Sequence, residues 1–134
     1  MSINDERYLQ IVRGFGLYHM IASLPLALPV VSGFTLSLFG TIHQALNLSG
    51  AWPAFDPTTL LFVNLFATLA TAWGYFRFKY PSQEIGRIEG IAMILFALIV
   101  IWYVAQGASP LWLFIAIVDS IGAYLHLKHP NNQM

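Results

Sequence analysis

The amino-acid sequence predicts an all-α fold: a bundle of four transmembrane helices with a short interfacial helix between the first and the second. Of its 134 residues, 57% are hydrophobic and 9% are charged, whereas soluble domains carry about 25% charged residues. No Asp, Glu, Lys or Arg lies between Arg13 and Asp56. A chain with so few charged groups cannot cover a surface that faces water, so lipid is the expected solvent. We expect a single domain over residues 1–134.

Four apolar segments have the length of a membrane span. They are Gly14 to Val31, Thr58 to Phe76, Ile88 to Gln106 and Leu111 to Leu127. Each is close to the roughly 20 residues that cross about 30 Å of hydrocarbon as a helix. Because a backbone in lipid must satisfy its own hydrogen bonds, all four segments are predicted to be helical.

The segment between the first two spans is also apolar, from Gly33 to Leu48. We expect it to lie in the outer interface, because a further crossing would move the basic residues of the next loop to the outer side. Helical spacing gathers its apolar residues on one face, as in helices that lie flat on a bilayer: Phe34, Leu38, Ile42 and Ala45. Pro25 and Pro29 are predicted to bend the first span near its end.

The basic residues set the orientation of the predicted spans. All six fall on one side: Arg7, Arg13, Arg77, Lys79, Arg87 and Lys128. The positive-inside rule makes that side cytoplasmic. We therefore expect a multi-pass protein of the cell (inner) membrane, with Met1 and Met134 in the cytoplasm and no cleaved signal peptide.

Ionisable residues inside a span are costly and mark candidate functional positions. Arg13 and Glu89 both lie within about one turn of the inner interface, and we expect them to form an ion pair. Asp119 lies roughly 13 Å beyond Lys128, near the bilayer centre, within reach of His19 on the first span. His19 and Asp119 are the expected buried pair, either as a structural hydrogen bond or as a site that handles protons or binds a ligand.

Polar side chains also follow one face of the second span, at spacings of four, three and four residues: Asn64, Thr68, Thr71 and Tyr75. A stripe of this kind faces protein or a wet cavity. We expect these residues, with His126 of the fourth span, to bind a ligand. Small residues at four-residue spacing are expected to be packing seams, namely Gly86 with Gly90 and Ala70 with Gly74.

Several classes of function are excluded by what the sequence lacks. The chain has no Cys, which removes disulfides and thiolate chemistry. Its formal net charge is zero and it has no basic patch, so nucleic acid is not an expected partner. The histidines are scattered without metal-binding spacing, so no metal site is expected: His19, His43, His126 and His129. No cofactor can be identified from the sequence.

The sequence also carries features of a known family. Arg13 with Gly14 and Gly16 opens the first helix, a long outer segment follows, Pro81 to Gly90 reads P-S-Q-E-I-G-R-I-E-G, and the last helix carries Asp119. In these features the chain resembles the DoxX-like group of small four-helix membrane proteins. The resemblance implies a small inner-membrane protein, in some members associated with quinone-linked oxidoreductases, and it implies no agreed set of catalytic residues.

Two functions are compatible with these observations. The first is a non-enzymatic accessory or binding protein for a lipid-like or quinone-type molecule, for a partner membrane subunit or for a second copy of the chain. The second is a membrane-embedded enzyme or proton-coupled carrier, of an isomerase or transporter kind, in which Asp119 and His19 exchange a proton. The candidate catalytic residues are then Asp119, His19 and Glu89.

Overall fold

A computed structural model describes residues 3–128 of the chain. The described part is all-α, and its helices are α1 (Ile3–Ala27), α2 (Pro29–Ala45), α3 (Pro57–Lys79), α4 (Gln83–Ala105), the short 3-10 helix η1 (Pro110–Trp112) and α5 (Leu113–Leu127). Met1 and Met134, whose cytoplasmic location is a prediction from the sequence, lie outside the described residues.

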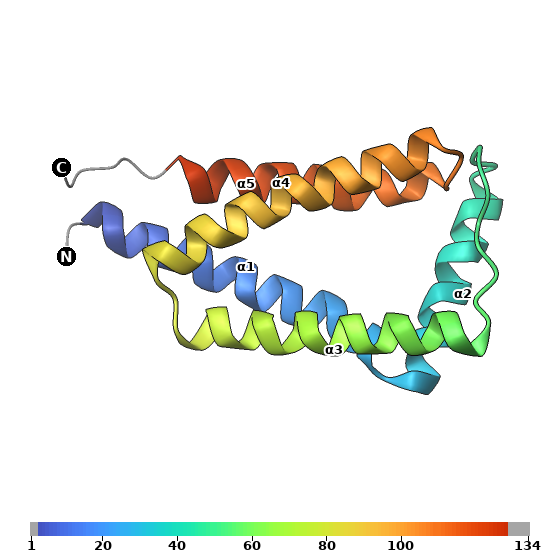
Figure 1. Ribbon diagram of the computed structural model, residues 1–134, viewed down its shortest axis with the longest axis horizontal. Helices are drawn as coiled ribbons and strands as arrows, with labels where there is room; N and C mark the ends of the chain where they lie inside the picture. Colours follow the sequence, from blue (N-terminus) through green and yellow to red (C-terminus); the bar gives the residue numbers. More distant parts are fainter. Residues whose placement is uncertain (1–2, 129–134) are drawn as a thin grey trace.

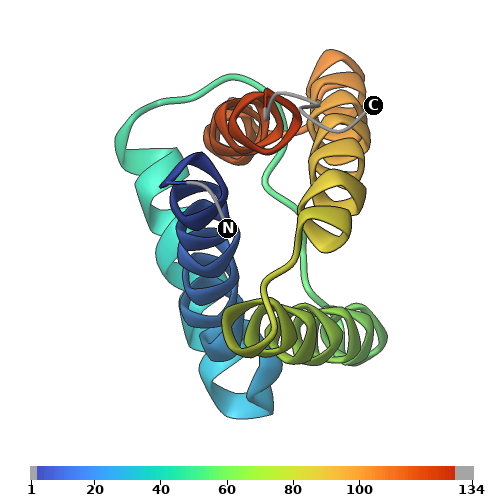
Figure 2. The same cartoon turned by 90° about the vertical axis from the view of Figure 1, so that its left-hand side faces the viewer.

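The long helices form two antiparallel pairs. α1 packs chiefly on α3, and α4 packs chiefly on α5, while contacts between the two pairs come mainly from α1. Figure 2 looks along these helices and shows α1 beside both α3 and α5. In Figure 1 the start of α1, the α3–α4 loop and the end of α5 lie at one end of the molecule, and α2 lies at the other. The predicted basic side is therefore one physical end of the bundle.

The first predicted span ends earlier than Val31. Pro25 is tolerated inside α1, but the helix stops at Ala27 and α2 starts at Pro29. Pro29 cannot donate a backbone hydrogen bond and holds Leu28 in an extended conformation (φ −96°, ψ 116°). The axes of α1 and α2 differ by 102° across this break. The bend expected at the two prolines is thus a full change of direction.

Within residues 3–128, three stretches are long and apolar enough to cross a membrane: α3, α4 and Pro110–Leu127. α1 and α2 pass the same test when taken together as one bent pair, which gives up to four spans. The outward surface of these helices is rich in exposed Leu, Ile and Phe, for example Leu65, Phe66, Leu95 and Phe114. A water-soluble protein would not expose apolar side chains so densely, so this surface suits lipid.

α2 closes the end of the molecule that is remote from the basic residues. Its buried face includes Leu36, Gly40 and His43, while the predicted apolar face turns outward, with Phe34 72% exposed. The Nδ1 atom of His43 lies 2.7 Å from the hydroxyl of Ser109 in the α4–α5 loop. α2 therefore connects the end of the first pair to the second pair.

The loop after α2 reinforces this connection. The amide of Ala51 donates to the carbonyl of Gly107 over 2.8 Å, and the rings of Trp52 and Trp112 stack with centroids 5.1 Å apart. Gly50 has a positive φ of 82°, and a Cβ there would lie 2.7 Å from the carbonyl oxygen of Ala108. Only glycine suits that backbone conformation at so close an approach.

The backbones of α1 and α3 approach each other closely where Gly16 faces Gly74. A Cβ added to Gly16 would lie 2.8 Å from the Gly74 carbonyl oxygen, and one added to Gly74 would lie 2.7 Å from that of Gly16. Gly74 is therefore in a packing seam, whereas Ala70, its predicted companion, is exposed. Gly86 and Gly90 are both buried in helix contacts, Gly86 against Tyr8 and Gly90 against Leu127 and His126.

We expect Gly16→Ala to lower the melting temperature in detergent, because the two backbones would have to separate. Overpacking of this kind costs about 1–3 kcal/mol. Gly14→Ala, two residues away on the same helix, is the control, because a Cβ there meets nothing within 4 Å. Equal melting temperatures for the two variants would show that the α1–α3 seam is assigned wrongly.

Candidate functional site

The centre of the candidate site is an ion pair between the two helix pairs. Nη1 of Arg77 on α3 lies 2.8 Å from Oε1 of Glu89 on α4. The indole of Trp73, one turn before Arg77, donates to Oε2 of the same carboxylate over 2.7 Å. The side chain of Arg77 is fully buried and that of Glu89 is 6% exposed. Both oxygens of Glu89 are thus held by one face of α3.

The predicted Arg13–Glu89 ion pair is wrong in its basic partner. Arg13 is exposed on α1, and the described ion pairs of Glu89 are with Arg77 and His19. The sequence predicts that Arg77 lies in the loop between the second and third spans, but α3 continues to Lys79. Helical side chains lean toward the N-terminus of their helix. Arg77 therefore points back into the bundle instead of toward the headgroups.

Glu89 also lies further from the start of its helix than the predicted span, which begins at Ile88, implies. α4 begins at Gln83, which places Glu89 six residues, or about 9 Å, along the helix. Arginine can reach this depth from the end of α3 because its side chain is long, and the buried carboxylate compensates its charge.

His19 of α1 connects this ion pair to α5. Nη2 of Arg77 contacts Nδ1 of His19, and Nδ1 lies 3.3 Å from Oε1 of Glu89. A guanidinium only donates hydrogen bonds and a carboxylate only accepts them, so Nδ1 lies between a donor and an acceptor; the tautomer in which Nδ1 accepts from Arg77 carries its proton on Nε2. In that tautomer the His19 ring presents an N–H group on its other side.

That N–H group faces Asp119, as the sequence predicts for this pair. Nε2 of His19 lies 4.0 Å from Oδ1 of Asp119, with the side chains 23% and 8% exposed. This separation is longer than a direct hydrogen bond. Among the described residues, no hydrogen bond ends on the carboxylate of Asp119. We call His19, Trp73, Arg77, Glu89 and Asp119 the polar cluster.

The charges of the polar cluster are unequally matched. Arg77 and Glu89 neutralise each other at 2.8 Å, while Asp119 faces a histidine whose Nδ1 is already occupied by Arg77. A carboxylate without a cation of its own is costly inside a membrane. The cluster is balanced when Asp119 carries a proton, and its hydroxyl is then a second donor beside His19.

The predicted polar stripe on α3 does not form a single lining. Asn64 donates to the Leu26 carbonyl over 2.7 Å and to the Ser32 hydroxyl over 2.8 Å. These bonds connect α3 to the break between α1 and α2, where a carbonyl lacks its helical partner. The hydroxyl of Thr71 lies 2.8 Å from that of Ser23 on α1. Thr71 and Asn64 therefore connect helices.

The other predicted ligand-binding residues lie apart. Thr68 is exposed and donates to the Asn64 carbonyl within its own helix, and Tyr75 is 50% exposed. His126 is fully buried on α5, and its Nδ1 lies 2.7 Å from the Gly122 carbonyl. Among the predicted site residues, the structure brings together His19, Glu89 and Asp119.

Trp73 and Arg77 are the two members of the cluster that the sequence reading missed. Their spacing of four residues puts them on one helical face, which was the available signal. The position of Arg77 pointed away from the site, because an arginine near the end of a span normally reaches the interface.

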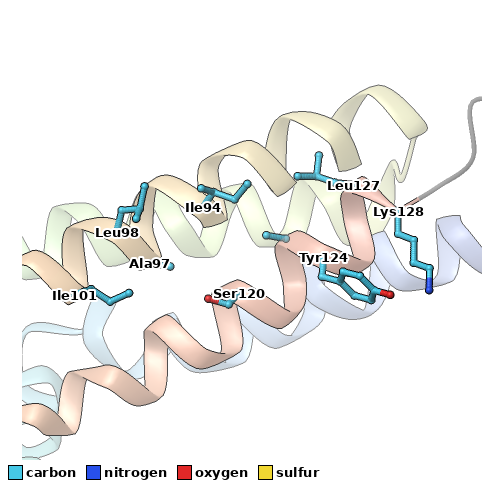
Figure 3. Close-up of a pocket in the computed structure, with 9 residues that line it drawn as sticks. Ile94, Ala97, Leu98, Ile101, Ser120, Tyr124, Leu127 and Lys128 are labelled. Carbon is cyan, nitrogen blue, oxygen red and sulfur yellow. The ribbon is translucent and has the colours of Figure 1, made fainter.

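Two apolar grooves lie on the outside of the bundle. The larger, of about 530 Å³, runs between α4 and α5 and contains none of the polar cluster. Figure 3 shows it lined by Ile94, Leu98 and Ile101 from α4, with Tyr124 and Lys128 at one end. The second, of about 330 Å³, lies between α1 and α5 and includes Tyr18 and Val118.

The α1–α5 groove is the one next to the cluster. Tyr18 and Val118 directly precede His19 and Asp119 in the chain, and the rings of Tyr18 and His19 have centroids 5.3 Å apart. The polar groups of His19 and Asp119 would thus lie within reach of an apolar molecule in this groove, on the far side of Tyr18.

Comparison with known proteins gives no relative: no family model, no curated protein and no solved structure matches the chain. The likeness to the DoxX-like group therefore stays an expectation from the sequence.

We expect Arg77→Met to destabilise the protein by about 3–5 kcal/mol, because Glu89 would be left buried without its cation. The double substitution Arg77→Met with Glu89→Met should recover most of that loss, since it removes both charges. Thermal melting in detergent measures both variants. A double variant less stable than Arg77→Met alone would contradict an energetically coupled pair.

Proposed function

We propose that the protein is a small binding or accessory protein of the cell (inner) membrane that binds a lipid-like or quinone-type molecule through a carbonyl oxygen. The observation that carries this proposal is the geometry of His19 and Asp119. Two groups able to donate face each other over 4.0 Å, and neither atom takes part in a hydrogen bond among the described residues.

A carbonyl oxygen placed to one side of these two donors can bridge them. It has two lone pairs, so it can accept from His19 Nε2–H and from the neutral carboxyl of Asp119 at ordinary lengths of about 2.7–3.0 Å. An apolar molecule that carries such an oxygen would satisfy both groups without introducing charge into the bilayer. Quinones and other carbonyl-bearing lipids have this chemistry.

The α1–α5 groove would take the apolar body of the molecule. Its volume of about 330 Å³ falls in the range of small-molecule sites. Its lining is apolar, with Ile11, Phe15 and Leu125 beside Tyr18 and Val118. The molecule would enter sideways from the lipid, with its carbonyl turned toward His19.

The arrangement proposed in the bilayer has α1, α3, α4 and α5 as spans and α2 as the outer interfacial helix. α1 has 25 residues, which gives about 37 Å of helix and is enough to cross the hydrocarbon. The angle of 102° between α1 and α2 supports a helix that lies along the surface. Five basic residues at the opposite end favour a cytoplasmic location for that end: Arg7, Arg13, Lys79, Arg87 and Lys128.

Single-cysteine labelling tests this topology in a chain that has no Cys. We expect Ser49→Cys to react with an impermeant maleimide in intact cells. Glu84→Cys, in the α3–α4 end, should react only after permeabilisation. Labelling of Glu84→Cys from outside would reverse the proposed orientation.

Binding of a short-tailed benzoquinone, measured by calorimetry in detergent, tests the proposed function. Asp119→Leu should weaken binding at least tenfold, or about 1.4 kcal/mol, because one donor is lost. Asp119→Asn should bind within about threefold of the wild type, since its amide still donates. Val118→Trp should block the α1–α5 groove, whereas Ile94→Trp in the other groove serves as the control. Unchanged binding by Asp119→Leu and Val118→Trp would refute the site.

The acid–base pair also supports a second function, that of an enzyme or proton-coupled carrier in which Asp119 and His19 exchange a proton. The two proposals differ in what they predict for Asp119→Asn. An amide keeps the hydrogen bond but cannot release a proton. Loss of activity in Asp119→Asn with retained quinone binding would favour the proton-exchanging function.

A further inference from the structure

The α4–α5 groove is separate from the polar cluster and has no part in the proposed function. Its floor consists of two small residues, Ala97 of α4 and Ala123 of α5, which are 5% and 4% exposed. Its walls are large apolar residues of the outer surface, such as Ile94, Leu98 and Leu127. Small residues between large ones leave a hollow of about 530 Å³. This hollow lies on the surface that suits lipid.

The lining of the groove includes a single charged residue, which lies at one end. Figure 3 shows Lys128 and Tyr124 at that end and Ile101 at the other. The ammonium of Lys128 lies 4.9 Å from the centre of the Tyr124 ring. An aromatic ring attracts a cation without neutralising it, so the positive charge can still attract an anion. The hydroxyl of Ser120 donates to the Ala116 carbonyl over 2.7 Å within α5, so it needs no acceptor from a ligand.

The groove is about as long as one lipid leaflet is deep. Along α5 it extends from Lys128 to Ser120, which is eight residues or about 12 Å. Half of the hydrocarbon layer of a bilayer is about 15 Å thick. Lys128 caps the C-terminal end of α5, at the end of the molecule that carries the basic residues. A molecule in the groove would therefore meet a positive charge at the headgroups and apolar side chains toward the bilayer centre.

We propose that the α4–α5 groove is a binding site for an anionic phospholipid, with one acyl chain over Ala97 and Ala123 and the phosphate at Lys128. A lysine ammonium has three donors and binds phosphate as a point charge. Basic residues beside transmembrane helices attract anionic headgroups in this way. The inference requires only that α4 and Pro110–Leu127 cross the membrane, and both are long and apolar enough to do so. It does not depend on the proposed binding of a carbonyl compound.

A phospholipid fits the groove better than a helix from a second copy of the chain or a neutral quinone does. A transmembrane helix would contact its partner over much of the roughly 30 Å of hydrocarbon, whereas the α5 side of the groove covers about 12 Å. A neutral molecule would leave the ammonium of Lys128 without an anion. Only an amphipathic molecule with a negative headgroup matches both the apolar hollow and the charge at its end.

Native mass spectrometry of the protein in detergent tests the site, with dioleoyl phosphatidylglycerol and dioleoyl phosphatidylcholine as probes. The two lipids have the same acyl chains and differ in the net charge of the headgroup. We expect the wild type to bind the first molecule of phosphatidylglycerol more tightly than the first of phosphatidylcholine. Lys128→Gln should weaken phosphatidylglycerol binding about fivefold and leave phosphatidylcholine binding unchanged. Equal affinity of the wild type for both lipids would overturn the proposal.

Lys79→Gln is the matched control for the charge. Lys79 is near the end of α3, on the basic side of the molecule, and its ammonium also lies over aromatic rings, 5.7 Å from the centre of Tyr75 and 5.4 Å from that of Tyr80. The substitution removes the same charge away from the groove, so lipid binding should stay at the wild-type level. An equal loss in both lysine variants would show attraction by general positive charge and would overturn the site.

Ile94→Trp tests the place of the acyl chain, because the indole would fill the groove. We expect it to weaken binding of both lipids at least threefold, whereas Val118→Trp in the α1–α5 groove should not. Ile94 is 42% exposed, and detergent melting checks that the variant folds. If it does not fold, Leu98→Trp, at a position 57% exposed, takes its place. Wild-type lipid binding in the folded variant would overturn the proposal.

The same spectra report the competing occupant and separate the two binding proposals. Dimers that disappear in Ile94→Trp, without a preference for phosphatidylglycerol in the wild type, would show that a second copy covers the groove and would overturn the lipid site. Benzoquinone binding should be unchanged in Lys128→Gln. Loss of quinone binding in Asp119→Leu concerns the carbonyl site alone, so either proposal can fail without the other.

Discussion

The contact between Arg77 and Glu89 is the interaction on which the centre of the molecule depends. The two helix pairs contact each other mainly through α1. Polar bonds between the pairs are therefore important for holding them together. In lipid no hydrophobic force drives helices together, and packing and hydrogen bonds must hold them. Arg77 and Trp73 supply two of those bonds from one face of α3, both to Glu89 on α4.

A buried arginine also constrains everything near it. Its charge is matched by the carboxylate of Glu89, and its second amino group contacts Nδ1 of His19. Nε2 of His19 in turn faces Oδ1 of Asp119 across 4.0 Å. The groups of the proposed binding site are thus positioned by a structural ion pair, to which His19 connects them.

At the opposite end, α2 performs a different task. The break at Pro29 turns the chain through 102°, and the bond from His43 to Ser109 fixes α2 to the second helix pair. Asn64 satisfies the carbonyl of Leu26 that the break leaves open. One pair of helices is therefore tied to the other at both ends, by charge at one and by α2 at the other.

The sequence by itself determined that the chain is helical and that its apolar helices suit a membrane. It also determined that the basic residues lie at one end of the bundle. These features follow from composition and from segment length. The sequence also singled out His19, Glu89 and Asp119, since ionisable residues stand out in an apolar span. Only the tertiary structure decided that Arg77, and not Arg13, pairs with Glu89, and that Asn64 and Thr71 connect helices. Those outcomes depend on how each helix is rotated about its axis and on where a long side chain reaches, and helical spacing alone fixes neither.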